Sequence, residues 1–386
     1  MNMFFNAQMR HIAVAQILIV IFFFNFACNR SNEKNTNALA TILKQTKEDY
    51  CADRRLAVFD IEGDLHGNTI ELTGDVDNPE SKTALLELVK STFPAYQIQD
   101  FITVFPDSTV GEKKWGLITV SVANLRTEPR YSAELANQVM MGTFVEILKK
   151  QKGWYYVRVN DGYLGWMNGS FFTRFTDGDK GRWQSEPRIV YKTLYGKVYA
   201  QPDESSMIVS DLVGGNILNV QRAGKSWTEV KLSPKRSGFV RTWNTVTHEQ
   251  WQKKRVVKAE DLARTAYQFK GLPYLWGGNS PKGVDCSGFT QSVFKWNGIK
   301  LLRDASQQYR QGSVVTSGSN FENVKAGDLL FFGPRVNKIT HVALYLGDRQ
   351  YIHSSGMVKI NSFDSTAVHF NRYRLNQFQG VRRILE

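Results

Sequence analysis

Cysteine is scarce in this sequence, with three residues in 386, at positions 28, 51 and 286. An odd number of widely spaced cysteines excludes the disulfide framework that holds small secreted domains together. A single bridge between Cys51 and Cys286 stays formally possible, although the two residues fall in different predicted domains. The cores must therefore form mainly by hydrophobic burial, and the length is enough for two to four domains.

Long runs of like charge are absent as well. The formal net charge is +13, yet the basic residues are scattered, and runs such as 253–255 and 382–383 are short. Clusters this short do not make the basic stripe of a nucleic-acid-binding protein, so no nucleic-acid partner is predicted. A basic chain instead suits an anionic partner such as a cell wall or lipid headgroups.

An uncharged stretch over residues 12–27 follows Arg10 and His11 and ends at Cys28. It is short and closes on a small residue plus cysteine, which predicts a secretory signal rather than a membrane span. The stretch resembles a bacterial lipoprotein signal. This resemblance implies that residues 1–27 are removed and that Cys28 is lipidated, which gives an exported lipoprotein anchored to a membrane. An uncleaved N-terminal anchor is the alternative, and it also predicts export.

The segment after Cys28 is predicted to be a polar tether over residues 28–37, followed by a small α+β module over residues 38–112. The module shows helical patterns over residues 38–52 and 81–91 and short strand patterns over 56–61, 69–73 and 97–105. Its expected order is a helix, two strands, a helix and a strand. The sequence predicts no role for this module or for its Cys51.

An internal repeat follows, because features of one segment recur 73 residues later. The matching pairs are Gly142 and Gly215, Trp154 and Trp227, Val157 and Val230, Gly165 and Gly238, and Trp166 and Phe239. Such a fixed period predicts two consecutive copies of one small all-β unit, over residues 113–176 and 188–247. With Asn124–Pro129, Gly153–Tyr155 and Asp161–Trp166, the first copy resembles bacterial SH3-like barrels, and the second copy resembles them more weakly.

The aromatic residues of the repeat have two interpretations. Trp154, Trp166 and Trp227 recur at fixed positions, so core packing is favoured over ligand stacking. Tyr163 lies in a tight Asp-Gly-Tyr turn, where burial is harder, and it is a candidate for binding a ligand.

The last predicted domain covers residues 256–386, with helices first and antiparallel strands after, which is typical of an α+β domain. Cys286 follows a glycine-rich segment and begins a helix whose apolar side chains recur at helical spacing as far as Asn297 and Gly298. At a helix start, free N–H groups and the helix dipole favour thiolate over thiol. A buried structural cysteine is the alternative.

Two histidines support a catalytic role for Cys286. His341 begins one predicted strand and His353 ends the next, and an odd-length loop such as Gly347–Arg349 would place both imidazoles on one sheet face. A loop of four residues would place them on opposite faces. With the sheet packed on the Cys286 helix, His341 becomes the base and His353 its orienting partner. A zinc site made by these three residues is the rival interpretation, but no Cys-x-x-Cys motif or closely paired histidines support it.

Several motifs in this domain resemble the NlpC-type peptidases, a circularly permuted branch of the papain-like cysteine peptidases that act on bacterial peptidoglycan. The motifs are Pro273–Gly278, Asp285–Phe289, Arg303–Gln308, Gly327–Leu329, His341–Ala343 and Tyr351–His353. The resemblance implies a multidomain protein in which a papain-like α+β domain follows two SH3-like domains and the N-terminal module. It implies no cofactor and no metal.

The resemblance also implies roles for individual residues. Cys286 would be the nucleophile, His341 the base and His353 the third polar residue, while Tyr274 and the Cys286 N–H would stabilise the oxyanion. The whole arrangement is similar to γ-D-glutamyl-L-diamino acid endopeptidases, which cut stem peptides before diaminopimelate or lysine and favour a free N-terminal L-alanine. The candidate substrate-binding residues are Glu134, Tyr163, Trp276, Asp285, Ser287, Asp304 and Ser306.

A second class of function stays open. The chain could be a wall-binding SH3-like protein whose peptidase domain is inactive or has an amidase-like specificity. The intact set of Cys286, His341 and His353 favours the enzyme, because an inactive domain is expected to lose at least one of them.

Overall fold

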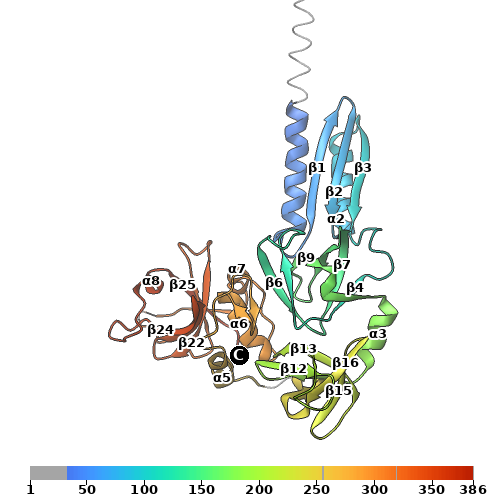
Figure 1. Cartoon of the computed structure of the whole chain (residues 1–386). Helices are drawn as coiled ribbons and strands as arrows, with labels where there is room; N and C mark the ends of the chain where they lie inside the picture. The colour runs from blue at the N-terminus through green and yellow to red at the C-terminus, as the bar shows by residue number, and fades with distance from the viewer. Residues whose placement is uncertain (1–32, 254–255, 319, 386) are drawn as a thin grey trace, which may run out of the picture. The chain divides into compact units, whose positions relative to one another are not determined.

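The computed structural model describes residues 33–253, 256–318 and 320–385, which form two compact units divided between Asp107 and Ser108 (Figure 1). The predicted signal over residues 1–27 and the lipidation site at Cys28 lie outside the described residues. Within the described part, no helix combines the length and the apolar character that crossing a membrane requires.

The first unit is a three-stranded sheet with helices, and its element order matches the sequence-based prediction. Helical residues run from 33 to 50. The elements after them are β1 (Phe59–His66), β2 (Thr69–Val76), α2 (Pro79–Thr92) and β3 (Gln97–Val104). β1 and β2 are antiparallel, whereas β3 pairs parallel to β2, which requires the helical crossover that α2 supplies. Leu39, Ile70, Leu72 and Leu85 form the centre of its core.

Two seven-stranded sheets follow, one for each copy of the repeat. The first repeat domain contains β4 (Trp115–Ile118), β5 (Val122–Arg126), β6 (Leu135–Met140), β7 (Phe144–Gln151), β8 (Trp154–Arg158), β9 (Leu164–Asn168) and β10 (Phe172–Phe175). The second contains β11 (Arg188–Tyr191), β12 (Tyr195–Tyr199), β13 (Ile208–Val213), β14 (Ile217–Arg222), β15 (Trp227–Ser233), β16 (Arg236–Arg241) and β17 (Thr245–Thr247). Helix α3 (Asp177–Ser185) connects them.

The second sheet repeats the first strand by strand. Every strand except β16 begins 73 residues after its counterpart, so the period seen in the sequence is a structural period. The predicted barrels are wrong in one respect. The sheets run β10-β4-β7-β8-β9-β5-β6 and β13-β12-β16-β15-β14-β11-β17, and within the described residues their outermost strands do not pair to close a barrel. Short strands and register shifts bend the sheets without closing them.

The C-terminal part packs helix α6 (Cys286–Trp296) against a six-stranded antiparallel sheet of order β20-β25-β21-β22-β23-β24 (Figure 1). Its strands are β20 (Ser313–Val315), β21 (Leu329–Phe332), β22 (His341–Gly347), β23 (Gln350–Ser355), β24 (Met357–Ser362) and β25 (Phe378–Arg383). The smaller elements are α4 (His248–Gln252), α5 (Ala259–Gln268), β18 (Asn279–Ser280), β19 (Gly283–Val284), α7 (Ala305–Gln308) and α8 (Arg372–Asn376). Phe289 and Val293 of α6 pack on Val342 and Ile352 of the sheet.

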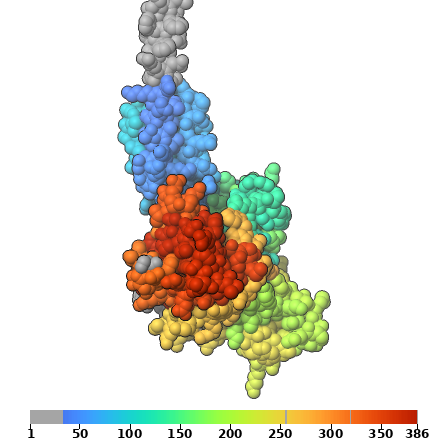
Figure 2. Space-filling model, turned by 90° about the vertical axis from the view of Figure 1, so that its left-hand side faces the viewer, coloured from blue at the N-terminus to red at the C-terminus, as the bar shows by residue number. Residues whose placement is uncertain are grey.

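The first repeat domain is joined to the C-terminal part by buried hydrogen bonds. The Gln138 side-chain oxygen accepts from the Asn279 N–H at 3.2 Å and from the Ser280 hydroxyl at 2.8 Å. Asn137 Oδ1 accepts from Arg303 Nε at 3.1 Å. In Figure 2 the orange and red surface of the C-terminal part meets the green surface of the repeats. The first repeat domain is therefore packed beside the start of α6.

Candidate active site

Cys286 is the first residue of α6, as the sequence predicts. Asp285 is the N-cap, and its Oδ1 accepts from the Gly288 N–H at 2.6 Å, which fixes the start of the helix. The thiol is 8% exposed. Sγ lies 4.0 Å from the Thr340 carbonyl oxygen and near the Val342 N–H, so the sulfur sits against the main chain on both sides of His341.

The hairpin of β22 and β23 brings His341 and His353 together, but not through the predicted loop. The prediction of a three-residue loop over Gly347–Arg349 is wrong, because Gly347 pairs with Gln350. The turn has two residues, Asp348 and Arg349, and both have positive φ. An even loop alone would place the histidines on opposite faces. A register shift between Tyr345 and Gly347 adds one residue to β22 and restores the common face.

A chain of hydrogen bonds fixes which ring nitrogens carry protons. The Asn361 amide nitrogen donates to the His369 carbonyl at 2.9 Å, which turns its oxygen toward His353. That oxygen accepts from His353 Nε2 at 2.8 Å, so His353 Nδ1 has a lone pair. His353 Nδ1 lies 2.7 Å from His341 Nε2 and accepts a hydrogen bond from the Nε2–H group. His341 Nδ1 is therefore left unprotonated and able to take a proton.

In the resting site the Cys286 thiol and the His341 imidazole are both uncharged, which differs from the expected thiolate. Burial and the negative charge of Asp285 raise the pKa of the Cys286 thiol to about 11. Burial and the neighbouring His353 lower the pKa of His341, and burial lowers the pKa of His353 to about 4. Desolvation disfavours both charged forms, so it outweighs the helix start, and thiol and imidazole are both uncharged near pH 7.

Alkylation of the free enzyme tests this protonation state. Because the thiolate is the reactive form and burial keeps it scarce, we expect the iodoacetamide rate at Cys286 to rise about tenfold per pH unit from pH 7 to pH 10. Mass spectrometry of the peptide that contains Cys286 measures this rate without interference from the other cysteines. A rate that stays flat from pH 6 to pH 9 would instead indicate a preformed thiolate–imidazolium pair.

Two further polar side chains lie near the thiol. Burial raises the pKa of Tyr274, so its phenol stays protonated and can donate a hydrogen bond. Arg374 of α8 was not predicted. Its half-buried guanidinium influences Cys286 and Tyr274, and burial lowers its pKa. Arg374 gives the site a positive charge that favours an anionic substrate, and no motif in the sequence marks it.

Asp285 forms a buried ion pair with Arg303, a residue to which the sequence analysis gave no individual role. Arg303, 1% exposed, donates from Nη1 to Asp285 Oδ1 at 3.0 Å and also bonds Oδ2. The Gly277 N–H donates to Oδ2 at 3.0 Å, and Ser287 lies 3.2 Å from both Asp285 and Arg303. Asp285 and Ser287 are thus parts of a buried network that positions the start of α6.

The remaining predicted residues form two contacts between the first repeat domain and the C-terminal part. Trp276, 62% exposed, donates from Nε1 to the exposed Glu134 carboxylate at 2.5 Å. The Tyr163 hydroxyl lies 3.2 Å from Asp304 Oδ2. Tyr163 is 7% exposed, so it is buried despite its tight turn, because the C-terminal part covers it. Ser306 is half-buried, on α7.

The structure also addresses the alternatives. Cys51 and Cys286 are both free thiols, and Cys51 Sγ lies 3.2 Å from the Ala57 carbonyl. In the part of the chain that the structure describes, no three His, Cys, Asp or Glu side chains gather as metal ligands. The imidazoles of His341 and His353 are hydrogen-bonded to each other. Of the repeat tryptophans, Trp154 is buried, whereas Trp166 and Trp227 are half-buried.

Comparison with known proteins identifies the family. Residues 271–378 match the NlpC/P60 family, and residues 121–173 match the bacterial SH3 domain. The chain is 31% identical over 264 residues to dipeptidyl-peptidase 6 of Lysinibacillus sphaericus, covering 64% of this chain and 91% of that protein. The chain belongs to the NlpC/P60 family.

A second relative and a solved structure support this family assignment. The γ-D-glutamyl-L-lysine dipeptidyl-peptidase of Bacillus cereus is 30% identical over 275 residues, covering 65% of this chain and 76% of the relative. The crystal structure of an NlpC/P60 family protein from Bacillus cereus superposes with a TM-score of 0.62 at 25% identity, over 70% of this chain and all of that one. The protein is thus a cysteine peptidase of multidomain SH3-like and NlpC/P60 architecture.

Proposed function

We propose that the protein hydrolyses the bond between γ-D-glutamate and the following L-diamino acid in peptidoglycan stem peptides. The observation that supports this most is the thiol of Cys286 held against the strand that begins with His341, whose ring is linked to His353 and Asn361. The relatives named for γ-D-glutamyl dipeptidyl-peptidase activity support the choice of bond.

The proposed reaction begins from the uncharged thiol and imidazole. His341 Nδ1 takes the thiol proton as Sγ bonds to the γ-carbonyl carbon of D-glutamate. The resulting oxyanion accepts hydrogen bonds from the Tyr274 hydroxyl and the Cys286 N–H, and such donors are commonly worth about 3 kcal/mol. The C–N bond then breaks, and the imidazolium gives its proton to the departing amine. Water, deprotonated by His341, cleaves the thioester and restores the thiol.

Asn361 is a positioning residue in this mechanism, and its replacement tests the proton chain. Asn361→Leu removes the acceptor for His353 Nε2, so we expect kcat/KM to fall roughly 10²-fold. Asn361→Asp keeps an acceptor and should retain more activity. Its negative charge should raise the pKa of the histidine pair. The acid limb of the kcat/KM profile would then move to higher pH, because the base must be unprotonated.

A merely structural role for Asn361 would lower activity at every pH without moving that limb. If the Asn361→Leu and Asn361→Asp variants show the same loss of activity and the same pH profile, the proposed placement of the ring protons is incorrect. Thermal unfolding of both variants, followed in parallel, shows whether either loss reflects misfolding.

We propose further that the enzyme favours peptides with a free N-terminal L-alanine. An ammonium needs an acceptor, and Asp285 already binds Arg303, whereas Glu134 is exposed beside Trp276. We expect acetylation of L-Ala-γ-D-Glu-diaminopimelate to lower kcat/KM about 10²-fold. Glu134→Gln should raise KM for the free-amine peptide roughly tenfold, mainly by removing that charge.

Glu128→Gln is the matched control, because Glu128 is exposed in the same domain and pairs locally with Arg130. It should leave the preference unchanged. Equal rates for free and acetylated peptides with the wild-type enzyme would discard the free-amine preference, whatever the variants do.

We propose from the sequence before residue 33 that the enzyme is exported and anchored to a membrane. A signal over residues 1–27 and a lipid at Cys28 would hold the enzyme at a membrane facing the cell envelope, where stem peptides and their recycling products are found. Fractionation of cells that express Cys28→Ser measures this. Retention of the variant in the membrane fraction would count against the lipid anchor.

A further inference from the structure

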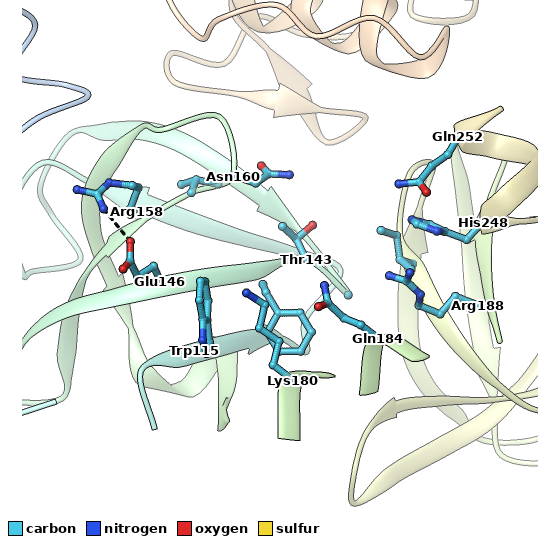
Figure 3. Close-up of a pocket in the computed structure, with 14 residues that line it drawn as sticks. Trp115, Thr143, Glu146, Arg158, Asn160, Lys180, Gln184, Arg188, His248 and Gln252 are labelled. Carbon is cyan, nitrogen blue, oxygen red and sulfur yellow. Dashed lines mark hydrogen bonds and ion pairs between the residues drawn. The ribbon is translucent and has the colours of Figure 1, made fainter. Parts of the chain in front are cut away.

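A cavity of about 510 Å³ lies between the two repeat domains (Figure 3), and its described lining does not include Cys286. The first repeat domain and helix α3 form one side of the lining, with Trp115, Thr143, Glu146, Arg158, Asn160, Lys180 and Gln184. The opposite side is formed by Arg188, His248 and Gln252. The volume is in the range of small-molecule and peptide sites, which often form at domain interfaces. A single small ion would fill only a fraction of it.

The lining of this inter-repeat pocket is positively charged. Glu146, the one carboxylate among the described lining residues, is paired with Arg158 at 2.7 Å. Lys180 and Arg188 are both half-buried, and Asp177 and Glu146 are the carboxylates that act on the charge of Lys180. Lys180 Nζ lies 2.9 Å from the centroid of the Trp115 ring, so the aromatic face is its nearest partner.

The charges of the pocket are only partly compensated. Burial lowers the pKa of Lys180 although the carboxylates of Asp177 and Glu146 act in the opposite direction, and burial lowers the pKa of Arg188. Burial and the positive charge of Arg188 lower the pKa of His248. Half-buried cations with incomplete counter-charge are unfavourable, and an anionic ligand would relieve this. Asn160, Gln184 and Gln252 add amide groups that can bond a peptide backbone.

We propose that the inter-repeat pocket is a second, non-catalytic binding site for a peptide that carries several carboxylates, namely a peptidoglycan stem peptide. The peptide class rests on the proposed function, whereas the cationic pocket does not. With Glu146 paired to Arg158, the described lining offers an ammonium no unpaired carboxylate. The pocket therefore does not require a free N-terminus, and it can bind stem peptides whose N-terminus is blocked. Such binding would keep the enzyme on peptidoglycan that has not yet been cleaved.

Calorimetric binding to the full chain carrying Cys286→Ala tests the proposal without turnover. The probe is N-acetyl-L-Ala-γ-D-Glu-diaminopimelate, and its carboxamide analogue should bind at least tenfold more weakly. We expect Lys180→Gln and Arg188→Gln each to weaken binding about tenfold, and Lys180→Arg and Arg188→Lys to retain most of it. Lys225→Gln, on an exposed loop of the second repeat domain, is the matched control and should change nothing.

Each other outcome overturns the proposal. Binding that is insensitive to both Gln variants would place the peptide elsewhere, and equal binding of the carboxamide analogue would exclude recognition of carboxylates. Binding of glycerol phosphate, but not the peptide, with the same dependence on Lys180 and Arg188 would assign the pocket to a phosphate polymer. Because the readout is binding, failure of the pocket is distinguishable from failure of the wild-type enzyme to cut the unblocked peptide.

Discussion

Replacing Cys286 with alanine should abolish hydrolysis of L-Ala-γ-D-Glu-diaminopimelate, lowering kcat/KM by at least about 10⁴-fold. The reason is that the thioester cannot form without the sulfur. Tyr274 and the α6 N–H groups can still stabilise charge, but they have no nucleophile to assist. Release of the diamino acid, followed by chromatography, measures the loss.

Cys51→Ala is the matched control for this substitution. Cys51 is also a buried free thiol, but it lies in the first unit, where its sulfur bonds the Ala57 carbonyl. Its replacement should leave hydrolysis unchanged. Cys286→Ala protein that releases the diamino acid at the wild-type rate would remove Cys286 as the nucleophile and leave the proposed reaction without a basis.

Replacing Arg303 with methionine should lower the free energy of unfolding by about 3–5 kcal/mol, because it leaves the Asp285 carboxylate buried without its cation. The corresponding fall in melting temperature is of the order of 10 °C. Arg303 also bonds Asn137, so the contact between the first repeat domain and the site should weaken. Calorimetric unfolding measures the change. Arg303→Lys keeps the positive charge but loses the two-pronged guanidinium, so its stability should lie between those of the wild type and Arg303→Met.

Arg130→Met is the control for loss of an ion pair as such. Arg130 pairs with Glu128 at 3.0 Å, and both side chains are 56% exposed, so water screens the pair and little stability should be lost. If Arg303→Met proved as mild as Arg130→Met, the N–H groups of Gly277 and Gly288 would have to be sufficient to hold the Asp285 charge.

Features set by neighbouring residues could be predicted from the sequence. The start of α6 at Cys286 was predicted from the glycine-rich segment before it and the helical spacing after it, and the structure adds the Asp285 cap. The period of 73 residues predicted two like sheets, because each copy has the same turns and apolar alternation. The assignment of His341 and His353 to adjacent strands followed from short strand patterns on either side of a turn.

What the tertiary structure decided depends on contacts between residues far apart in the chain. The extra residue in β22 restored the common face of the histidines, and β24 supplied Asn361 to set their protons. Packing of the C-terminal part on the first repeat domain buried Tyr163 and left Glu134 exposed beside Trp276. Burial also keeps the Cys286 thiol and the His341 imidazole uncharged, since desolvation depends on everything packed around a group. Local sequence sets helix starts and strand periods, whereas solvent exclusion and partner choice arise only when distant segments meet.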